Sequence, residues 1–173
     1  EEEYEASGIP FDQRVKTFWE TLDICQSLWT GGPVSHKGEI FEFNDIWCHP
    51  TPPQGSDIPL LFGVKMTESN AQKIATTGHG WIPIKTSRDF ISEGSEKLNN
   101  AFKEAGRDDK PRIRGQLPTC VDSNGVPSVD LTLKELEKSM EAGLEEIEVF
   151  PINFAQSPDH LREVLELIGE IKK

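Results

Sequence analysis

Residues 58–84 contain two short apolar runs on either side of one helical segment. The first run, residues 59–62, stops at a glycine. Thr67 then opens a segment whose apolar residues share one helical face, and Gly78 ends that segment just before the second run. A buried strand, a crossover helix and a second buried strand form the repeating unit of α/β proteins. This stretch therefore predicts parallel strands, and the rest of the chain must supply elements that pack on them.

The same alternation continues to the end of the chain. Residues 112–117 and 145–150 are predicted as the third and fourth strands. Predicted helices cover residues 87–105 and 132–143 and begin again at Ser157, which is followed by a proline and an acid. Right-handed crossovers would place all four strands parallel and adjacent. We therefore expect an α/β fold built from four consecutive βα units.

Two of these helix predictions depend on local detail. Thr132 and Glu135 have the spacing of a capping box, which predicts that the third helix begins there. In the last helix, apolar residues recur at helical spacing and predict a buried face. That face consists of Leu161, Val164, Leu165 and Ile168.

The first third of the chain precedes these units. Residues 1–7 form an acidic leader that we expect to be solvated. Apolar residues at helical spacing predict a helix over residues 11–29. Short alternating stretches and a proline-rich connector predict a β hairpin and excursion over residues 31–57. We interpret residues 1–173 as one domain that contains this excursion.

Composition narrows the function classes. The chain has 30 acidic and 18 basic residues, a formal net charge of -12, which argues against nucleic acid and against an anionic membrane surface as partners. Neither a membrane-spanning apolar run nor a signal-peptide pattern is visible. Three widely spaced cysteines are typical of a reducing compartment. We expect a soluble cytoplasmic protein.

Residues Gly63, Val64, Lys65, Met66 and Thr67 join the first strand to its helix. Free backbone N–H groups and the positive end of the helix dipole can hold a phosphate or another anion at such a corner. The alternative is an ordinary βα turn in which Thr67 only caps the helix. Turn chemistry leaves both interpretations open.

The third and fourth strands alternate charged and β-branched residues. In parallel strands with helices on one face, the other face would carry the charges. We predict that Arg112 or Arg114 pairs with Glu146 or Glu148 on that face, because buried charges need partners. Ile113, Ile147 and Val149 would pack on the helices. This role is structural.

Other catalytic patterns receive no support. His36, Cys48 and His49 could suggest a metal site, but Cys48 and His49 are adjacent and no fourth ligand has a suitable spacing, so we expect no metal. Nucleophile-elbow, Walker and dinucleotide-binding glycine patterns are not found in the sequence.

A series of short motifs, in order and over nearly the whole chain, resembles the luciferase-like monooxygenase superfamily of FMN-dependent and coenzyme F-420-dependent enzymes. The motifs are Gly8-Ile9-Pro10-Phe11, Leu28-Trp29-Thr30, Val34-Ser35-His36-Lys37-Gly38 with Phe41, Pro50-Thr51-Pro52-Pro53-Gln54, Pro59-Leu60-Leu61-Phe62-Gly63 and Gly78-His79-Gly80-Trp81. His79 is a departure, because the family usually has aspartate there.

The resemblance implies a (β/α)₈ barrel, typically about 250 residues long, with its active site at the C-terminal ends of the strands. This chain would supply the last four βα units, equivalent to strands 5–8, which is half a barrel. Four parallel strands cannot close, so the missing N-terminal half, a second copy or some other cover would protect the edges. The implied activity is hydride transfer or oxygen activation at a flavin or deazaflavin ring. The alternative is a non-catalytic half-barrel that self-associates and has at most a partial cofactor site.

The resemblance also implies roles for individual residues. Residues 63–67 would contact the FMN or F-420 cofactor or its phosphate. Lys85 and Thr86, which follow the second strand on the same edge, would contact a small-molecule substrate, although Ser87 could simply start a helix there. Thr119, Asn153 and Phe154 have the same position after the other two strands. The catalytic residues stay unassigned.

Overall fold

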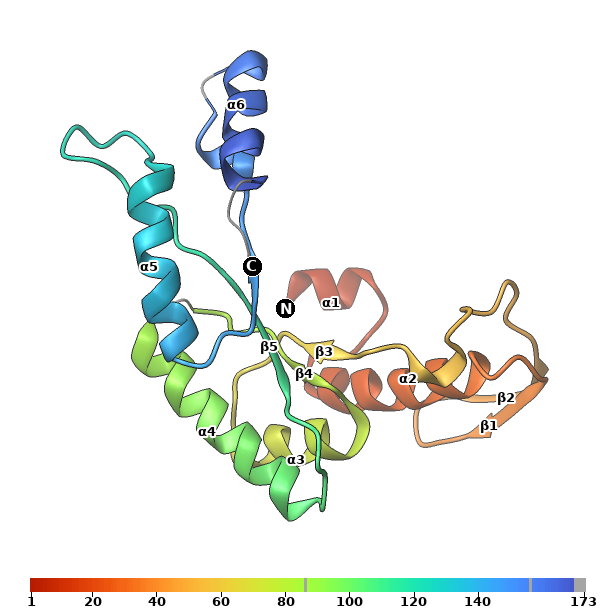
Figure 1. The fold of residues 1–173 in the computed structure, drawn as a ribbon. Coiled ribbons are helices and arrows are strands. Elements are labelled where there is room, and N and C mark those ends of the chain that lie inside the picture. Colours follow the sequence, from red (N-terminus) through yellow and green to blue (C-terminus); the bar gives the residue numbers. More distant parts are fainter. Residues whose placement is uncertain (86, 156, 170–173) are drawn as a thin grey trace. The chain divides into compact units, whose positions relative to one another are not determined.

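Four short parallel strands form the sheet of the C-terminal two thirds of the chain (Figure 1). The structure is a computed structural model that describes residues 1–85, 87–155 and 157–169. The chain divides into two compact units, Glu1–Ile58 and Pro59–Lys173. That both units belong to one domain stays a prediction.

The first unit combines a long helix with a hairpin. Its elements are α1 (Glu2–Ala6), the 3-10 turn η1 (Phe11–Gln13), α2 (Arg14–Leu28), β1 (Val34–Lys37), β2 (Glu42–Ile46) and η2 (Gly55–Asp57). Strands β1 and β2 are antiparallel, which confirms the hairpin predicted within residues 31–57, and α2 confirms the predicted helix. The leader is exposed as expected, but part of it is helical, because acids in a first turn favour a helix N-terminus.

A carboxylate from α2 holds the turn between β1 and β2. Glu20 accepts hydrogen bonds from the backbone N–H groups of Phe41 (2.8 Å), Ile40 (3.1 Å) and Glu39 (3.2 Å), and lies 3.0 Å from the His36 ring. Burial raises the pKa of Glu20, but these hydrogen bonds outweigh it, so the pKa lies below its ordinary value. The turn is therefore organised by one side chain of the helix.

The second unit has the predicted βα order. Its elements are β3 (Leu61–Phe62), α3 (Glu68–Thr77), β4 (Gly80–Trp81), α4 (Arg88–Glu104), β5 (Arg112–Gln116), α5 (Val129–Glu141), β6 (Glu146–Glu148), η3 (Pro151–Asn153) and α6 (Pro158–Gly169). The strand order is β3-β4-β5-β6 and every neighbouring pair is parallel. The predicted set of four adjacent parallel strands is confirmed.

The start of α5 differs from the prediction. The helix begins three residues before Thr132, and its cap is Ser128, whose hydroxyl accepts the N–H of Leu131 at 3.3 Å. Thr132 lies buried inside the helix and accepts the N–H of Cys120 at 2.8 Å. The capping-box pattern failed here because the preceding loop uses the Thr132 hydroxyl. By contrast, Ser157 caps α6 as predicted, accepting the N–H of His160 at 3.1 Å.

The core lies between the sheet and helices α3 and α4. Trp81 and Leu98 have no exposed surface, and Phe102 has almost none. Burial of such large apolar side chains is the main favourable term in folding. The predicted buried face of α6 is confirmed only in part: Val164 is buried, whereas Leu165 is half exposed.

The predicted charge pairs on β5 and β6 are confirmed. Glu146 bonds to the Arg112 side chain and, at 2.8 Å, to Nε of Arg114. These hydrogen bonds, first that from Arg112 and then that from Arg114, hold the pKa of Glu146 below its ordinary value. Ile113, between the two arginines, is buried on the opposite face of the strand.

Among residues 1–85, 87–155 and 157–169, none of the helices combines the length and the apolar character that a membrane crossing requires.

Candidate functional site

The loop from Gly63 to Thr67 lies between the C-terminal end of β3 and the N-terminus of α3. Gly63, Lys65 and Thr67 are exposed and Val64 is half-buried. Met66 is buried, so its side chain belongs to the core and only its backbone can face a ligand. The predicted segment is thus brought together as one short surface loop.

Two carbonyl groups of this loop are turned toward the protein. Trp81 Nε1 donates to the carbonyl oxygen of Val64 at 2.8 Å, and Asn70 Nδ2 donates to that of Lys65 at 2.9 Å. In a planar trans peptide the next N–H points opposite to the carbonyl. The N–H groups of Lys65 and Met66 therefore point away from these partners.

Thr67 caps α3, as one of the two interpretations predicted. Its hydroxyl accepts the N–H of Asn70 at 3.2 Å. The cap orders the first turn of α3, whose remaining N–H groups carry the positive end of the helix dipole. Capping and anion binding are compatible, because a hydroxyl that accepts one hydrogen bond can still donate another.

Gly63 leaves the approach to the loop open. A Cβ atom placed on Gly63 would meet no heavy atom within 4 Å, and the residue does not have a positive φ. The glycine is therefore required neither by packing within the chain nor by its backbone conformation. What it provides is access to the neighbouring backbone.

Lys85 follows β4, so it lies at the same C-terminal end of the strands as the loop from Gly63 to Thr67. Its side chain is exposed, and Nζ lies 5.8 Å from the ring centroid of Phe90. The Phe90 ring in turn lies 5.7 Å from that of Trp81, the residue that holds Val64. Trp81 thus connects the two predicted segments. Thr86, the other predicted substrate residue, lies outside the described residues.

The groups in this loop fit an anionic part of a cofactor. Backbone N–H groups, a helix N-terminus and the ammonium group of Lys65 are the donors of this loop, and Glu68 adds one carboxylate to the first turn of α3. A phosphate or carboxylate could approach over Gly63, where no side chain stands in the way. Both FMN and F-420 carry such groups, so the donors present here suit either cofactor.

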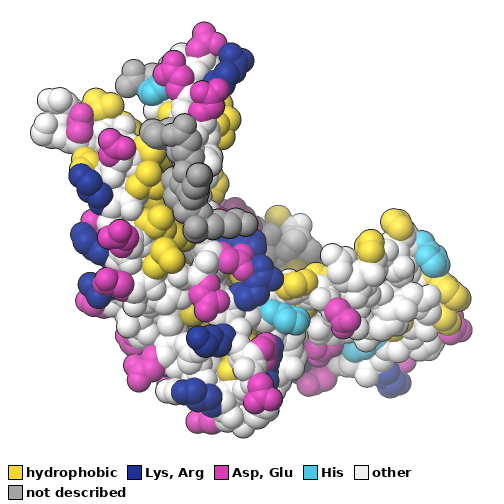
Figure 2. Space-filling model, viewed as in Figure 1, with side chains coloured by type: hydrophobic (Ala, Val, Ile, Leu, Met, Phe, Trp, Pro, Cys, Tyr) yellow, Lys and Arg dark blue, Asp and Glu magenta, His cyan; other side chains and the backbone are white. Residues whose placement is uncertain are grey.

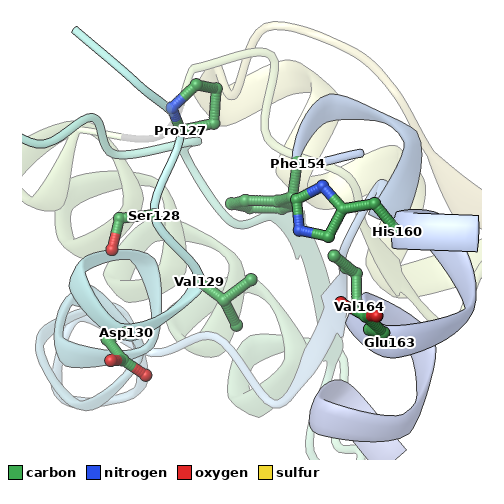
Figure 3. Close-up of a pocket in the computed structure, with 8 residues that line it drawn as sticks. All are labelled: Pro127, Ser128, Val129, Asp130, Phe154, His160, Glu163 and Val164. Carbon is green, nitrogen blue, oxygen red and sulfur yellow. The ribbon is translucent and has the colours of Figure 1, made fainter. Parts of the chain in front are cut away.

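A cavity of about 270 Å³ lies after β5 and β6, between the first turns of α5 and α6 (Figure 3). Phe154 and Val164 are buried in its wall, and the His160 ring lies beside Phe154 in the view. Asp130 and Glu163 add two carboxylates to the lining. The cavity combines an apolar surface with titratable groups at the strand ends.

The other residues singled out in the sequence have mostly structural partners. Asn153 Nδ2 donates to Thr119 Oγ1 at 3.2 Å, which joins the segments after β5 and β6. His79 accepts the N–H of Leu60 through Nδ1 at 3.1 Å, next to the β3–β4 ladder. The His36 ring forms a hydrogen bond with the Glu20 carboxylate. No group of three or more potential metal ligands was found in the parts of the chain that the structure describes.

Sequence reasoning missed Trp81, Asn70 and the cavity. A buried tryptophan in a core strand is an ordinary packing residue, so the pattern carries no signal that its N–H holds a distant carbonyl. Asp130 and His160 belong to helix first turns, where polar residues are common. That both line one cavity depends on how α5 and α6 pack.

Comparison with family models identifies one family. The family model described as luciferase-like monooxygenase matches residues 1–126. An uncharacterized protein of Mycobacterium tuberculosis strain H37Rv is 36% identical over 107 residues, which are 61% of this chain and 37% of that protein. A second uncharacterized protein of the same strain is 28% identical over 106 residues, 61% of this chain and 35% of that protein. The match thus spans little more than a third of these relatives' length.

Solved structures show the same fold at low identity. The monooxygenase RslO1 from Streptomyces bottropensis has a TM-score of 0.61 and 18% identity, covering 96% of this chain and 54% of that one. The coenzyme F420-dependent tetrahydromethanopterin reductase from Methanopyrus kandleri has a TM-score of 0.64 and 16% identity, with coverages of 84% and 58%. An F420-dependent secondary alcohol dehydrogenase in complex with an F420-acetone adduct has a TM-score of 0.62, 17% identity and coverages of 75% and 54%. The predicted fold class, TIM-barrel-type βα units covering part of such a barrel, is confirmed.

Proposed function

Because the chain belongs to the luciferase-like monooxygenase family, we propose that it forms part of an oxidoreductase that uses coenzyme F-420 or FMN. F-420 is favoured, since two of the similar solved structures are described as F420-dependent. Hydride transfer is the corresponding reaction, and oxygen activation is the alternative if the cofactor is FMN. A cytoplasmic location belongs to the same proposal, because Cys25, Cys48 and Cys120 are free thiols.

One observation carries the proposal. The loop after β3 has its Val64 and Lys65 carbonyls held by Trp81 and Asn70, which turns the following N–H groups away from these two partners, next to an exposed glycine. The C-terminal ends of barrel strands are where enzymes of this fold place their active sites. An ordered, donor-rich loop at that edge is suited to hold the cofactor's anionic groups.

The chain's own residues would bind and orient the cofactor. The N–H groups of Lys65 and Met66 would donate to a phosphate or carboxylate oxygen, and the Lys65 ammonium would add charge. Thr67 would order the first turn of α3, and Trp81 would keep the loop in place. When bound, the flavin or deazaflavin ring supplies the redox chemistry, as is general for such cofactors.

The substrate would be a small molecule bound on the same edge. Lys85 is the described residue of the predicted substrate pair, and its exposed ammonium is separated from the cofactor loop by the packed Phe90 and Trp81 rings. The cavity lined by Phe154 and His160 offers a second surface at the strand ends. The position of the bound cofactor would decide whether Lys85 or this cavity contacts the substrate.

A second candidate function is assembly without catalysis, since among the described residues β3 pairs only with β4 and β6 only with β5. Titrating F-420 and FMN separately into the purified chain, with cofactor fluorescence as the readout, separates the two. We expect saturable binding of F-420 and weaker binding of FMN. If neither cofactor binds to the folded chain in either redox state, the cofactor proposal is wrong for this chain and the assembly role is left.

A further inference from the structure

The cavity between the first turns of α5 and α6 takes no part in holding the cofactor loop. Its volume of about 270 Å³ is roughly that of nine water molecules in the liquid. All of its lining residues belong to the second compact unit and follow β5 or β6 in the chain. A space of this size suits a small organic molecule rather than a single ion.

Part of the cavity wall is apolar and aromatic. Phe154 and Val164 line the cavity and are only 5% and 3% exposed. The Val129 side chain points toward α6, and the His160 imidazole lies beside the Phe154 ring (Figure 3). Such a wall would bury the hydrocarbon part of a ligand, and the face of an aromatic ring attracts a cation.

The carboxylates of the lining make this cavity negative. Asp130 belongs to the first turn of α5 and Glu163 to α6, and both are exposed. Among the described residues, neither a lysine nor an arginine lines the cavity. Helix α6 adds Asp159 and Glu166 against Arg162, and acidic side chains lie over this helix on the face shown in Figure 2. The local field therefore favours a cation and disfavours a phosphate or a carboxylate.

Hydrogen bonds order both sides of the cavity without a ligand. On the α5 side, the Thr132 hydroxyl accepts the N–H of Cys120 at 2.8 Å, and the N–H of Ser128 donates to the carbonyl oxygen of Cys120 at 2.8 Å. On the α6 side, the Ser157 hydroxyl accepts the N–H of His160 at 3.1 Å. A preformed site loses less conformational entropy when a ligand binds, which favours binding of even a small molecule.

We propose that this cavity binds a small organic cation, an amine whose apolar body packs on Phe154 and Val164 and whose ammonium group is attracted by the two carboxylates. A neutral imidazole at His160 offers the ammonium group a further acceptor. The positive end of the α5 dipole offsets part of the Asp130 charge, whereas Glu163 lies beyond the first turn of α6. Glu163 therefore contributes more to the attraction than Asp130.

Binding of the amine does not require the cofactor, but its meaning does. The cavity follows β5 and β6, and barrel enzymes place their active sites at the C-terminal ends of the strands. If the chain is part of a flavin or deazaflavin oxidoreductase, the amine is its substrate, and this consequence rests on the proposed function.

Three aromatic probes of similar size test the charge preference on the full chain. They are benzylamine, which is a cation at neutral pH, benzyl alcohol, which is neutral, and benzoate, which is an anion. Backbone amide chemical shifts, followed during each titration, give the dissociation constant and the residues that respond. Benzylamine should bind about fivefold more tightly than benzyl alcohol, and benzoate more weakly than either. The responding amides should be those of residues 128–130, 154 and 160–164. Raising the salt from about 0.05 M to about 0.5 M should reduce the preference for the amine.

Neutral variants of the two carboxylates test their role. Glu163→Gln should weaken benzylamine binding about fivefold and leave benzyl alcohol binding unchanged, and Asp130→Asn should have a smaller effect of the same kind. Both side chains are exposed, so the variants should keep the wild-type circular dichroism spectrum. Glu166→Gln is the matched control, because Glu166 is exposed on the same helix but does not line the cavity. It should bind benzylamine as wild type does.

Several results would overturn the cation site. They are benzoate binding as tightly as benzylamine, no benzylamine binding, shifts that map outside the cavity, unchanged amine affinity in both carboxylate variants, and an equal loss in Glu166→Gln. The titrations contain no cofactor, so the two proposals fail separately. Amine binding by a chain that binds neither F-420 nor FMN contradicts only the proposed function, whereas cofactor binding without amine binding contradicts only the cation site.

Discussion

Gly94 of α4 lies directly against the indole ring of Trp81, so that a Cβ atom at Gly94 would overlap the ring. Glycine inside a helix is normally unfavourable by about 1 kcal/mol relative to alanine. Here it lets α4 approach β4 closely enough to bury Trp81 completely. The same indole donates to Val64, so this contact also supports the candidate cofactor loop.

Gly94→Ala should therefore destabilise the protein, although alanine is the better helix former. Overpacking of a buried site costs about 1 to 3 kcal/mol, which exceeds the propensity gain. Urea unfolding followed by tryptophan fluorescence measures the change. Gly63→Ala is the control, since a methyl group there meets nothing within 4 Å. Equal or higher stability of Gly94→Ala would show that α4 can shift away without cost.

Gly63→Ala should leave stability unchanged and weaken cofactor binding. The methyl group would project over the outward N–H groups of the loop, where we place the anionic part of the cofactor. We expect a loss of affinity of about tenfold, which corresponds to one displaced hydrogen bond of about 1.4 kcal/mol. Titration of F-420 and FMN into wild type and variant provides the measurement. Binding unaffected by this substitution would remove Gly63 from the site.

Glu146→Gln should lower the stability at neutral pH by about 1 kcal/mol, between the values for exposed ion pairs and for hydrogen bonds to charged groups. The folded pKa of Glu146 lies below its ordinary value of 4.5, because Arg112 and Arg114 favour the carboxylate. Its stabilising contribution is thus complete above that ordinary value and is lost as the pH falls through the folded pKa.

Urea unfolding at several pH values between neutral and acid measures this effect. The variant should lose part of the acid-side decrease in stability that wild type shows. Glu137→Gln, an exposed position on α5, serves as the control and should retain the wild-type pH dependence. If the free energy of unfolding of Glu146→Gln decreased toward acid pH as much as that of wild type, the ion pairs of Glu146 with Arg112 and Arg114 would not contribute to the pH dependence of stability.

Glu20→Ala should open the β1–β2 turn. Burial raises the pKa of Glu20, but the hydrogen bonds from Phe41, His36, Ile40 and Glu39 lower it by more. The pKa of Glu20 in the folded protein is therefore below its ordinary value. The carboxylate therefore orders the turn at neutral pH and loses this effect as the pH falls through its folded pKa.

Amide hydrogen exchange at residues 39–41 reports this opening. Exchange should be faster in Glu20→Ala at neutral pH, while amides in α2 stay protected. Glu42→Ala removes only an exposed pair with Lys37 and is the matched control. Unchanged protection of residues 39–41 would contradict the role given to Glu20.

Much of the fold was predictable because local chemistry decides it. Residues 59–62 and the apolar face of α3 gave the βα order, and the Ser157-Pro158-Asp159 start of α6 was recognisable from capping alone. The alternation of Arg112 and Arg114 with Ile113 indicated a charged face, and the chemistry of buried charges then predicted Glu146 or Glu148 as a partner, of which Glu146 makes the close contacts. These signals lie within a few residues of the elements they specify.

The location of the candidate site in the chain was predictable, but the contacts that shape it were not. The sequence by itself determined that residues 63–67 join a strand to a helix at the edge where barrel enzymes bind ligands. Only the tertiary structure decided that Trp81 and Asn70 hold the loop carbonyls, that Ser128 rather than Thr132 caps α5, and that Phe154 and His160 share a cavity. Periodicity encodes which face of an element is buried. It does not encode which distant group a polar atom meets, because that depends on strand register and helix packing.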